Sequence, residues 1–74
     1  MADNANANSV AKVTELSSRS NKSFEDAIQA GIARASKTLR NVNSAWVKEQ
    51  RVEVKEGKIV SYQVNLAITF TLDG

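Results

Sequence analysis

The chain has 74 residues, of which 42% are hydrophobic, and its ten Lys and Arg against eight Asp and Glu give a net charge of +2. That balance excludes the strongly basic surface of a nucleic-acid-binding protein, and no apolar run is long enough to cross a membrane. Neither Cys nor His is present, which excludes disulfides and removes the commonest transition-metal ligand and general base. A domain this small usually then depends on oligomerisation. We therefore expect a cytoplasmic protein that assembles with copies of itself, without a nucleic-acid or membrane partner.

The N-terminal part of the chain is expected to contain a tail and a short strand. Residues 1–9 are rich in Asn and Ala and lack the basic and apolar regions of a signal peptide. We expect them to form a flexible tail, followed by one domain over residues 10–74. Spaced apolar residues predict a first strand over residues 10–16, and the serine-rich residues 17–23 predict a turn.

A helix is predicted from Phe24 to Leu39 or Arg40. Either Ser20 or Ser23 can be its N-cap, and Ser23 with Asp26 three residues later matches the capping-box pattern. Its apolar residues recur at three- and four-residue steps and form one stripe: Phe24, Ile28, Ile32, Ala35 and Leu39. A second line consists of small residues: Ala27, Gly31 and Ala35. Such a line either lets another backbone approach closely or forms a flat surface that packs on the sheet, and we favour the sheet.

The remainder of the chain is predicted to form one long β-hairpin. After a break over residues 41–43, its first strand is expected over residues 44–54 and its turn over residues 55–58. The last strand runs from about Ile59 to Leu72, where apolar and polar residues alternate. A strand of about a dozen residues spans roughly 40 Å, about twice the usual length. Because one helix is too short to cover it, the hairpin also indicates assembly.

The predicted fold class is α+β with the order β-α-β-β, a three-stranded antiparallel sheet wrapped around one helix. If Glu56 and Gly57 are the two turn residues, the hairpin register follows. That register pairs Val54 with Ile59, Gln50 with Gln63, and Trp46 with Ala67. The even-numbered residues from Val60 to Phe70 then face the helix. The face away from the helix carries Trp46, Lys48, Gln50, Val52, Gln63, Asn65 and Ala67.

The chain carries no recognisable catalytic constellation, and we expect neither an enzyme nor a metal site. It lacks a glycine-rich phosphate loop, and its carboxylates are spaced as solvated surface groups. The single Trp46 shares its predicted face with amide side chains, and an indole and amides are suited to stack a planar heterocycle and read its edges. Alternatively, Trp46 packs at a subunit contact, which the pattern alone favours, and Gln63 pairs with Gln50.

Five short segments carry a resemblance to a known family. They are AIQAGIARA over residues 27–35 and KTLR over 37–40, Val47-Lys48-Glu49 with Arg51, Tyr62-Gln63-Val64, and Phe70-x-Leu72. On these residues the chain resembles the dodecins, small β-α-β-β proteins that assemble into hollow dodecameric shells. The resemblance covers about residues 13–73 and implies a hollow homododecamer of this chain.

The resemblance also implies a flavin, FMN or riboflavin, stacked in antiparallel pairs between tryptophans across a symmetry axis. Gln63 matches the family's glutamine that hydrogen-bonds the flavin ring, and Arg51 matches a basic residue of bacterial members. The family's stacking tryptophan falls on Ser44, and Trp46 follows two residues later, about 6.6 Å further along the same face. The candidate flavin-binding residues are therefore Trp46, Gln63, Ser44 and Arg51.

Two functions remain open at this point. The first is a flavin-storage or flavin-buffering protein that stacks flavin at a subunit interface of a dodecameric shell. The alternative is a flavin-free assembly of the same kind, with a structural role or another small ligand, because the family includes members that lack the tryptophan.

Overall fold

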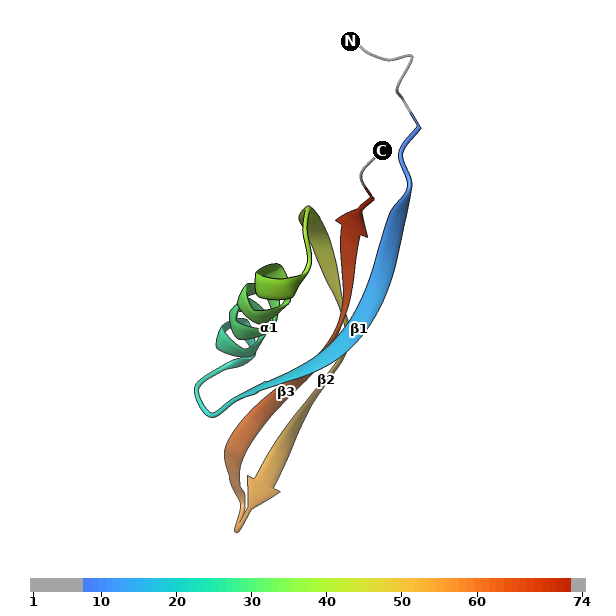
Figure 1. The fold of residues 1–74 in the computed structure, drawn as a ribbon. Coiled ribbons are helices and arrows are strands. Elements are labelled where there is room, and N and C mark those ends of the chain that lie inside the picture. Colours follow the sequence, from blue (N-terminus) through green and yellow to red (C-terminus); the bar gives the residue numbers. More distant parts are fainter. Residues whose placement is uncertain (1–7, 73–74) are drawn as a thin grey trace.

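A computed structural model describes residues 8–72, with four elements in the order β1 (Ala11–Ser20), α1 (Phe24–Thr38), β2 (Val42–Lys55) and β3 (Lys58–Thr71). The three strands form one antiparallel sheet in the order β1-β3-β2. The predicted β-α-β-β fold is confirmed. α1 lies on one face of the sheet, and the β2-β3 hairpin extends beyond it (Figure 1). In the part of the chain that is described, no helix is long and apolar enough to cross a membrane. The predicted tail falls mainly on residues 1–7, outside the described residues.

β1 is longer than the sequence predicted. It continues through Ser20, so the turn expected from Ser17 is wrong: residues 17–20 pair with residues 62–65 of β3. The physical reason is that every second residue of β1 projects away from the helix, where polar side chains stay solvated, so strand pairing there needs no apolar residues. Only residues 21–23 connect β1 to α1.

Hydrogen bonds at both ends of α1 explain its limits. Of the two candidate N-caps, Ser23 is the one that caps the helix, and its Oγ accepts a hydrogen bond from the Asp26 backbone N–H at 3.0 Å. The Ser20 hydroxyl donates to Asp26 Oδ2 at 2.7 Å. At the other end, the Leu39 N–H donates to Ala35 O at 2.9 Å, and Asn41 adopts a φ of 63° that no helix continues. The helix therefore ends one or two residues earlier than predicted.

The small-residue line of α1 packs on the sheet, which confirms the interpretation we favoured. Ala27 is 0% exposed, and Gly31 and Ala35 are also buried. A Cβ at Gly31 would lie 2.9 Å from Leu66 Cδ1, so a larger residue there would force Leu66 or the helix to shift. The core consists of Ala27, Ala35, Val64, Leu66 and Ile68, with seven partly buried residues around it: Leu16, Phe24, Ile28, Ile32, Leu39, Val42 and Ala45.

The hairpin turn has the predicted residues at its centre. Glu56 and Gly57 both have positive φ, 53° and 77°, the pattern of a type I′ turn that matches the twist of the two strands. β2 is longer than predicted, because the connection from α1 consists of residues 39–41 and strand pairing already begins at Val42, directly after the left-handed residue Asn41.

The hairpin register is confirmed next to the turn and from Ser44 to Val47, wrong between these stretches, and shifted once more at Asn43, at the start of β2. Val54 pairs with Ile59 and Trp46 with Ala67, as predicted, but Gln63 pairs with Arg51 instead of Gln50. An extra residue on β3, Val60, shifts the register by one, and an extra residue on β2, Lys48, shifts it back.

The two shifts change which side chains share a face. Gln50 pairs with Val64, and Val52 pairs with Tyr62. Both side chains therefore lie on the face of the sheet that α1 covers, and the prediction that they lie on the other face is wrong. Val60 is 41% exposed and is not part of the core beneath α1.

The described chain is extended, and its core is thin. Its radius of gyration is 15.8 Å, against about 11 Å for a compact domain of this length. Large apolar side chains are exposed at both ends of the sheet and in its middle: Val10, Val13, Trp46, Val47, Val54, Ile59, Val60 and Leu72. One helix therefore leaves much of the long sheet without a cover.

Candidate functional site

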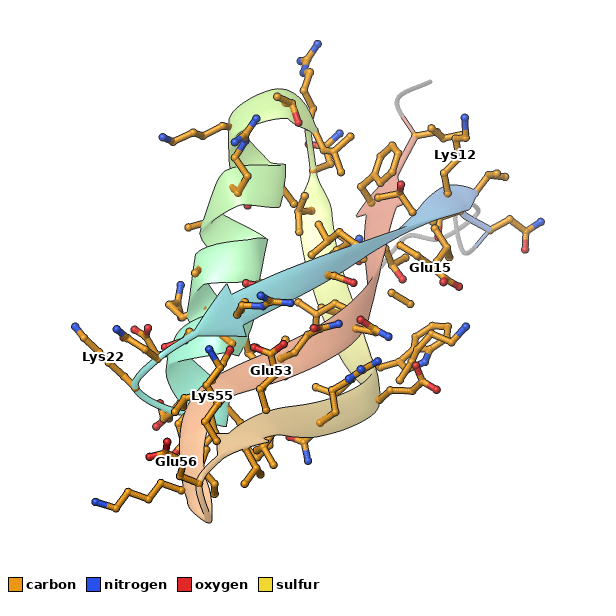
Figure 2. All side chains as sticks on the ribbon, turned by 90° about the horizontal axis from the view of Figure 1, so that it is seen from below. Lys12, Glu15, Lys22, Glu53, Lys55 and Glu56 are labelled. Carbon is orange, nitrogen blue, oxygen red and sulfur yellow. The ribbon has the colours of Figure 1, made fainter. Side chains whose placement is uncertain are left out.

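The predicted site lies on the face of the sheet turned away from α1, which we call the open face. Residues paired across neighbouring strands share a face, and the pairing defines rows that cross β1, β3 and β2. From the end of the sheet far from the hairpin turn to the end near it, the rows on the open face are Val13–Thr69–Ser44, Glu15–Ala67–Trp46, Ser17–Asn65–Glu49 and Arg19–Gln63–Arg51. Figure 2 shows the side chains on the ribbon, with Glu15 of the second row labelled. All four candidate residues, Ser44, Trp46, Arg51 and Gln63, belong to these rows.

Trp46 and Ser44 occupy adjacent rows near the chain termini. Trp46 is 53% exposed, which leaves an aromatic surface available to a planar ligand or to a second copy of the chain. Its row partner on β3 is Ala67, whose single methyl group does not project above the sheet. Ser44 is exposed and contributes a hydroxyl but no ring. The aromatic surface of the open face is therefore that of Trp46.

Gln63 and Arg51 form a second pair of candidates, brought into one row by the extra residue Lys48. The row of Asn65 lies between this pair and Trp46. Four residues of β3 separate the rows of Gln63 and Trp46, which corresponds to about 13 Å along the strand. One protomer thus brings together Gln63 with Arg51, and Trp46 with Ser44, but keeps the two pairs apart.

A chain of hydrogen bonds links the two rows nearest the hairpin turn. Arg19 Nη2 donates to Gln63 Oε1 at 3.1 Å, and Gln63 Nε2 donates to Asn65 Oδ1 at 3.5 Å. Asn65 Nδ2 donates to Glu49 Oε1 at 2.7 Å, and Ser17 Oγ donates to Asn65 Oδ1 at 2.7 Å. Gln63 is therefore held by other side chains even without a ligand.

A second polar contact crosses the central strand. Lys48 Nζ lies 2.8 Å from Glu15 Oε2, and the pair joins β2 to β1 across β3. The hydrogen bond to the Glu15 carboxylate, and its negative charge, raise the pKa of Lys48 above the ordinary 10.5. Glu15 lies in the row of Ala67 and Trp46, Lys48 is the unpaired residue between Val47 and Glu49, and the ion pair is exposed to solvent.

Of the four candidate residues, Ser44 lines a depression of about 200 Å³ together with Ile32, Val42, Asn43 and Ala45. A depression of about 390 Å³ on the open face is lined by charged and polar groups, together with Leu16, and neither Trp46 nor Gln63 belongs to it. Among residues 8–72 no group of three or more Asp, Glu, His or Cys side chains is placed to hold a metal ion. A single chain therefore presents a flat indole and a row of polar groups that a second copy would have to enclose.

Sequence reasoning missed Ser17, Arg19 and Glu49 as contributors to this face. The first two were assigned to a turn, and Glu49 was placed on the wrong side because the register omitted the extra residue Lys48. One signal was present in the sequence: the polar alternation of Glu15, Ser17 and Arg19 has the two-residue period of a strand.

Comparison with known proteins shows the family and the fold. The family model described as Dodecin matches residues 10–73. A dodecin from Thermus thermophilus is 44% identical over 64 residues, which cover 86% of this chain and 93% of that relative.

Solved structures show the same fold. The crystal structure of a Thermus thermophilus protein superposes with a TM-score of 0.85 at 42% identity, covering 90% of this chain and 98% of that one. The dodecin from Streptomyces davaonensis gives a TM-score of 0.85 at 35% identity, with 92% and 100% covered. Because the family model spans every element of the fold and a relative well above 30% identity is matched over most of its length, this chain belongs to the dodecin family.

Proposed function

We propose that this protein binds flavin, FMN or riboflavin, at an interface between copies of the chain in a hollow homododecamer, and serves to store or buffer the cofactor. The observation that carries the proposal is the common placement of Trp46, Gln63, Arg51 and Ser44 on the open face. Membership of the dodecin family supports it. The same family supports a non-enzymatic, cytoplasmic role.

The residues on the open face fit the chemistry of a flavin ring. The exposed indole of Trp46 is flat and polarisable, and covering it with the isoalloxazine ring removes two large aromatic surfaces from water. The Gln63 amide offers both a donor and an acceptor to the uracil-like edge of the ring. Arg51, in the row of Gln63, supplies a cation suited to a negatively charged group on the ligand.

The separation of the two candidate pairs supports a site shared between copies. Trp46 and Gln63 lie two rows apart in one protomer, and neither is enclosed by its own chain. A flavin ring stacked on Trp46 at a symmetry axis would also contact the Trp46 of a second copy. The polar edge of the ring would then form hydrogen bonds with the nearest Gln63 of the assembly, in the same copy or in another. Two copies would also enclose the aromatic surface that one protomer leaves 53% exposed.

Titration of the purified full-length protein with FMN and with riboflavin tests this proposal. Stacking on Trp46 is expected to quench flavin fluorescence, and Trp46→Ala is expected to weaken binding by more than about 1 kcal/mol. Gln63→Ala should cost about 0.5–1.5 kcal/mol, the net value of one hydrogen bond. Val47→Ala is the matched control, because Val47 is the next residue but pairs with Leu66 on the helix side. Its affinity for flavin should equal that of the unaltered protein.

A specific observation favours the second candidate function, a flavin-free assembly with a structural role or another small ligand. Ser44 stands where the family's stacking tryptophan is expected, and the Gln63 oxygen already accepts a hydrogen bond from Arg19. The variant Ser44→Trp separates the two functions. If neither flavin is quenched by the unaltered protein but quenching appears in Ser44→Trp, Trp46 has a structural role and the flavin-free assembly replaces the flavin-binding one.

A further inference from the structure

We infer that Arg19 and Glu49 are positioning residues for Gln63, and that together they determine which atom of the Gln63 amide is offered to a ligand. The consequence for binding rests on the proposed function. The orientation of the amide is a property of the protein without ligand and is tested separately.

A glutamine amide carries an acceptor and a donor in nearly interchangeable positions, so its neighbours decide its orientation. The guanidinium of Arg19 only donates hydrogen bonds, and the carboxylate of Glu49 only accepts them. These two groups lie at opposite ends of the chain Arg19→Gln63→Asn65→Glu49. Every link runs in the same direction, from the cation to the anion.

Reversing either amide would break this chain. A reversed Gln63 would turn its NH₂ group toward the Arg19 donor, and a reversed Asn65 would turn its oxygen toward the Glu49 carboxylate. Ser17 supports the same orientation, since its hydroxyl donates to Asn65 Oδ1 at 2.7 Å. Glu53 Oε1 lies 3.8 Å from Arg19 Nη1 and helps to hold the guanidinium beside Gln63.

The two ends of the Gln63 amide are unequally engaged. Its oxygen accepts a charge-assisted hydrogen bond from Arg19 at 3.1 Å, whereas its nitrogen makes only a long contact of 3.5 Å to Asn65. The amide nitrogen, with a second N–H to donate, is therefore the group most available on the open face. The ligand edge that Gln63 reads should present an acceptor, such as a carbonyl of a pyrimidine ring.

Neutron crystal structures of the deuterated, unliganded full-length assembly test the orientation, because deuterium distinguishes the amide nitrogen from the amide oxygen. We expect the Gln63 amide to have one orientation in the unaltered protein, with its oxygen toward Arg19, and to become flipped or multiple in Arg19→Met. Arg19→Lys, which keeps a charged donor, should restore the single orientation. Arg34→Met is the matched control, because it removes the same charge from an exposed position on α1. An unchanged Gln63 orientation in all four proteins would overturn the inference.

Binding measurements test the consequence with a double-mutant cycle. Arg19→Met should raise Kd for FMN and for riboflavin alike by about 2- to 12-fold, equivalent to one hydrogen bond. In the Gln63→Ala background the same substitution should change Kd by less than about 1.5-fold, because no amide remains to be positioned. An undiminished effect in that background, or an effect confined to FMN, would show that Arg19 contacts the ligand directly and would overturn the inference. If the unaltered protein binds neither flavin, the proposed function fails, and the crystal structures still decide the orientation.

Discussion

At the scale of single residues, Ala67 shows how a small side chain shapes the open face. It is 0% exposed although it lies on the face that α1 does not cover. Glu15 pairs with Ala67, and its carboxylate reaches Lys48 across β3. The small side chain at this row agrees with a contact between two strands that are not neighbours.

The pKa of Lys48 should depend on its ion pair with Glu15. Its pKa is raised because the ammonium donates a hydrogen bond to the Glu15 carboxylate and is attracted by its charge. The stabilisation is therefore fully present below the unfolded-state pKa near 10.5 and is lost as pH rises through the higher folded-state pKa. We expect an NMR titration to give a pKa above 10.5 for Lys48 in the unaltered protein and a lower one in Glu15→Gln. Glu25→Gln, on the exposed side of α1, should leave it unchanged, and an identical pKa in all three proteins would contradict the ion pair.

Glu56 is held in a conformation that its side chain disfavours. Its φ of 53° lies in the left-handed region, which costs a residue with a Cβ roughly 1–2 kcal/mol and costs Asn less. Glu56→Asn should therefore stabilise the protein by about 0.5–1 kcal/mol. Urea unfolding at a fixed protomer concentration would measure this. The control is Lys58→Asn, at the start of β3 with ordinary φ, where no gain is expected. Equal midpoints for Glu56→Asn and the unaltered protein would rule out strain at the turn.

At the scale of elements, two irregularities in the hairpin decide which residues form the site. Val60 and Lys48 each add one residue to one strand, and between them the register moves by one. Since side chains alternate with a period of two, a one-residue shift reverses the face of every β2 residue in that interval. Arg51 joins Gln63 for this reason, while Gln50 leaves the open face.

The close packing of α1 on the sheet should make Gly31 intolerant of a methyl group. A Cβ there would lie 3.1 Å from Ser18 Cβ, which is fixed to the backbone of β1, and 2.9 Å from Leu66 Cδ1. The gain in helix propensity of about 1 kcal/mol is expected to be smaller than the overpacking cost of about 1–3 kcal/mol. Gly31→Ala should therefore destabilise the protein by about 1 kcal/mol, measured by urea unfolding.

The comparison for Gly31→Ala is Ala30→Gly, at an exposed helix position. That change should cost about 1 kcal/mol through helix propensity alone. A Gly31→Ala variant more stable than the unaltered protein would mean that the helix does not pack as closely as described.

At the scale of the whole molecule, the extended shape and the exposed apolar residues explain why a single copy is an incomplete unit. The radius of gyration of 15.8 Å shows an extended chain, and an extended chain buries little apolar surface for the number of residues that it orders. Small domains that bury little surface are only marginally stable. Burying the exposed valines, Ile59 and Trp46 against other copies would supply the missing apolar contact.

We therefore predict that the protein exists as a large homo-oligomer, most simply the dodecamer proposed above, with no stable monomer. Light scattering at micromolar concentration should give a mass near twelve times the 8.0 kDa of the chain. Thermal unfolding should shift upward with protomer concentration, as expected when assembly and folding are linked. A folded species of 8 kDa under these conditions would contradict the prediction.

Much of the fold could be predicted because local signals and long-range packing agree. The α1 stripe, the Ser23 cap and the Glu56-Gly57 turn each have a local cause, and all three are present in the structure. The C-terminal end of β1 could not be predicted from the sequence. Serines are common in turns and also occur on the solvated face of a strand, and no apolar residues distinguish the two cases here. The dodecin resemblance identified the family correctly.

The sequence by itself determined the order of the elements, the helix face, the turn and the residues at the buried centre of β3, because these follow from periodicity and from the conformational limits of single residues. Only the tertiary structure decided that Arg19 and Glu49 hold Gln63 and that Arg51 shares its row. These relations depend on register across three strands and on two extra residues whose positions leave no local pattern. The side chains that make up the open face were therefore settled by strand pairing rather than by the sequence around each of them.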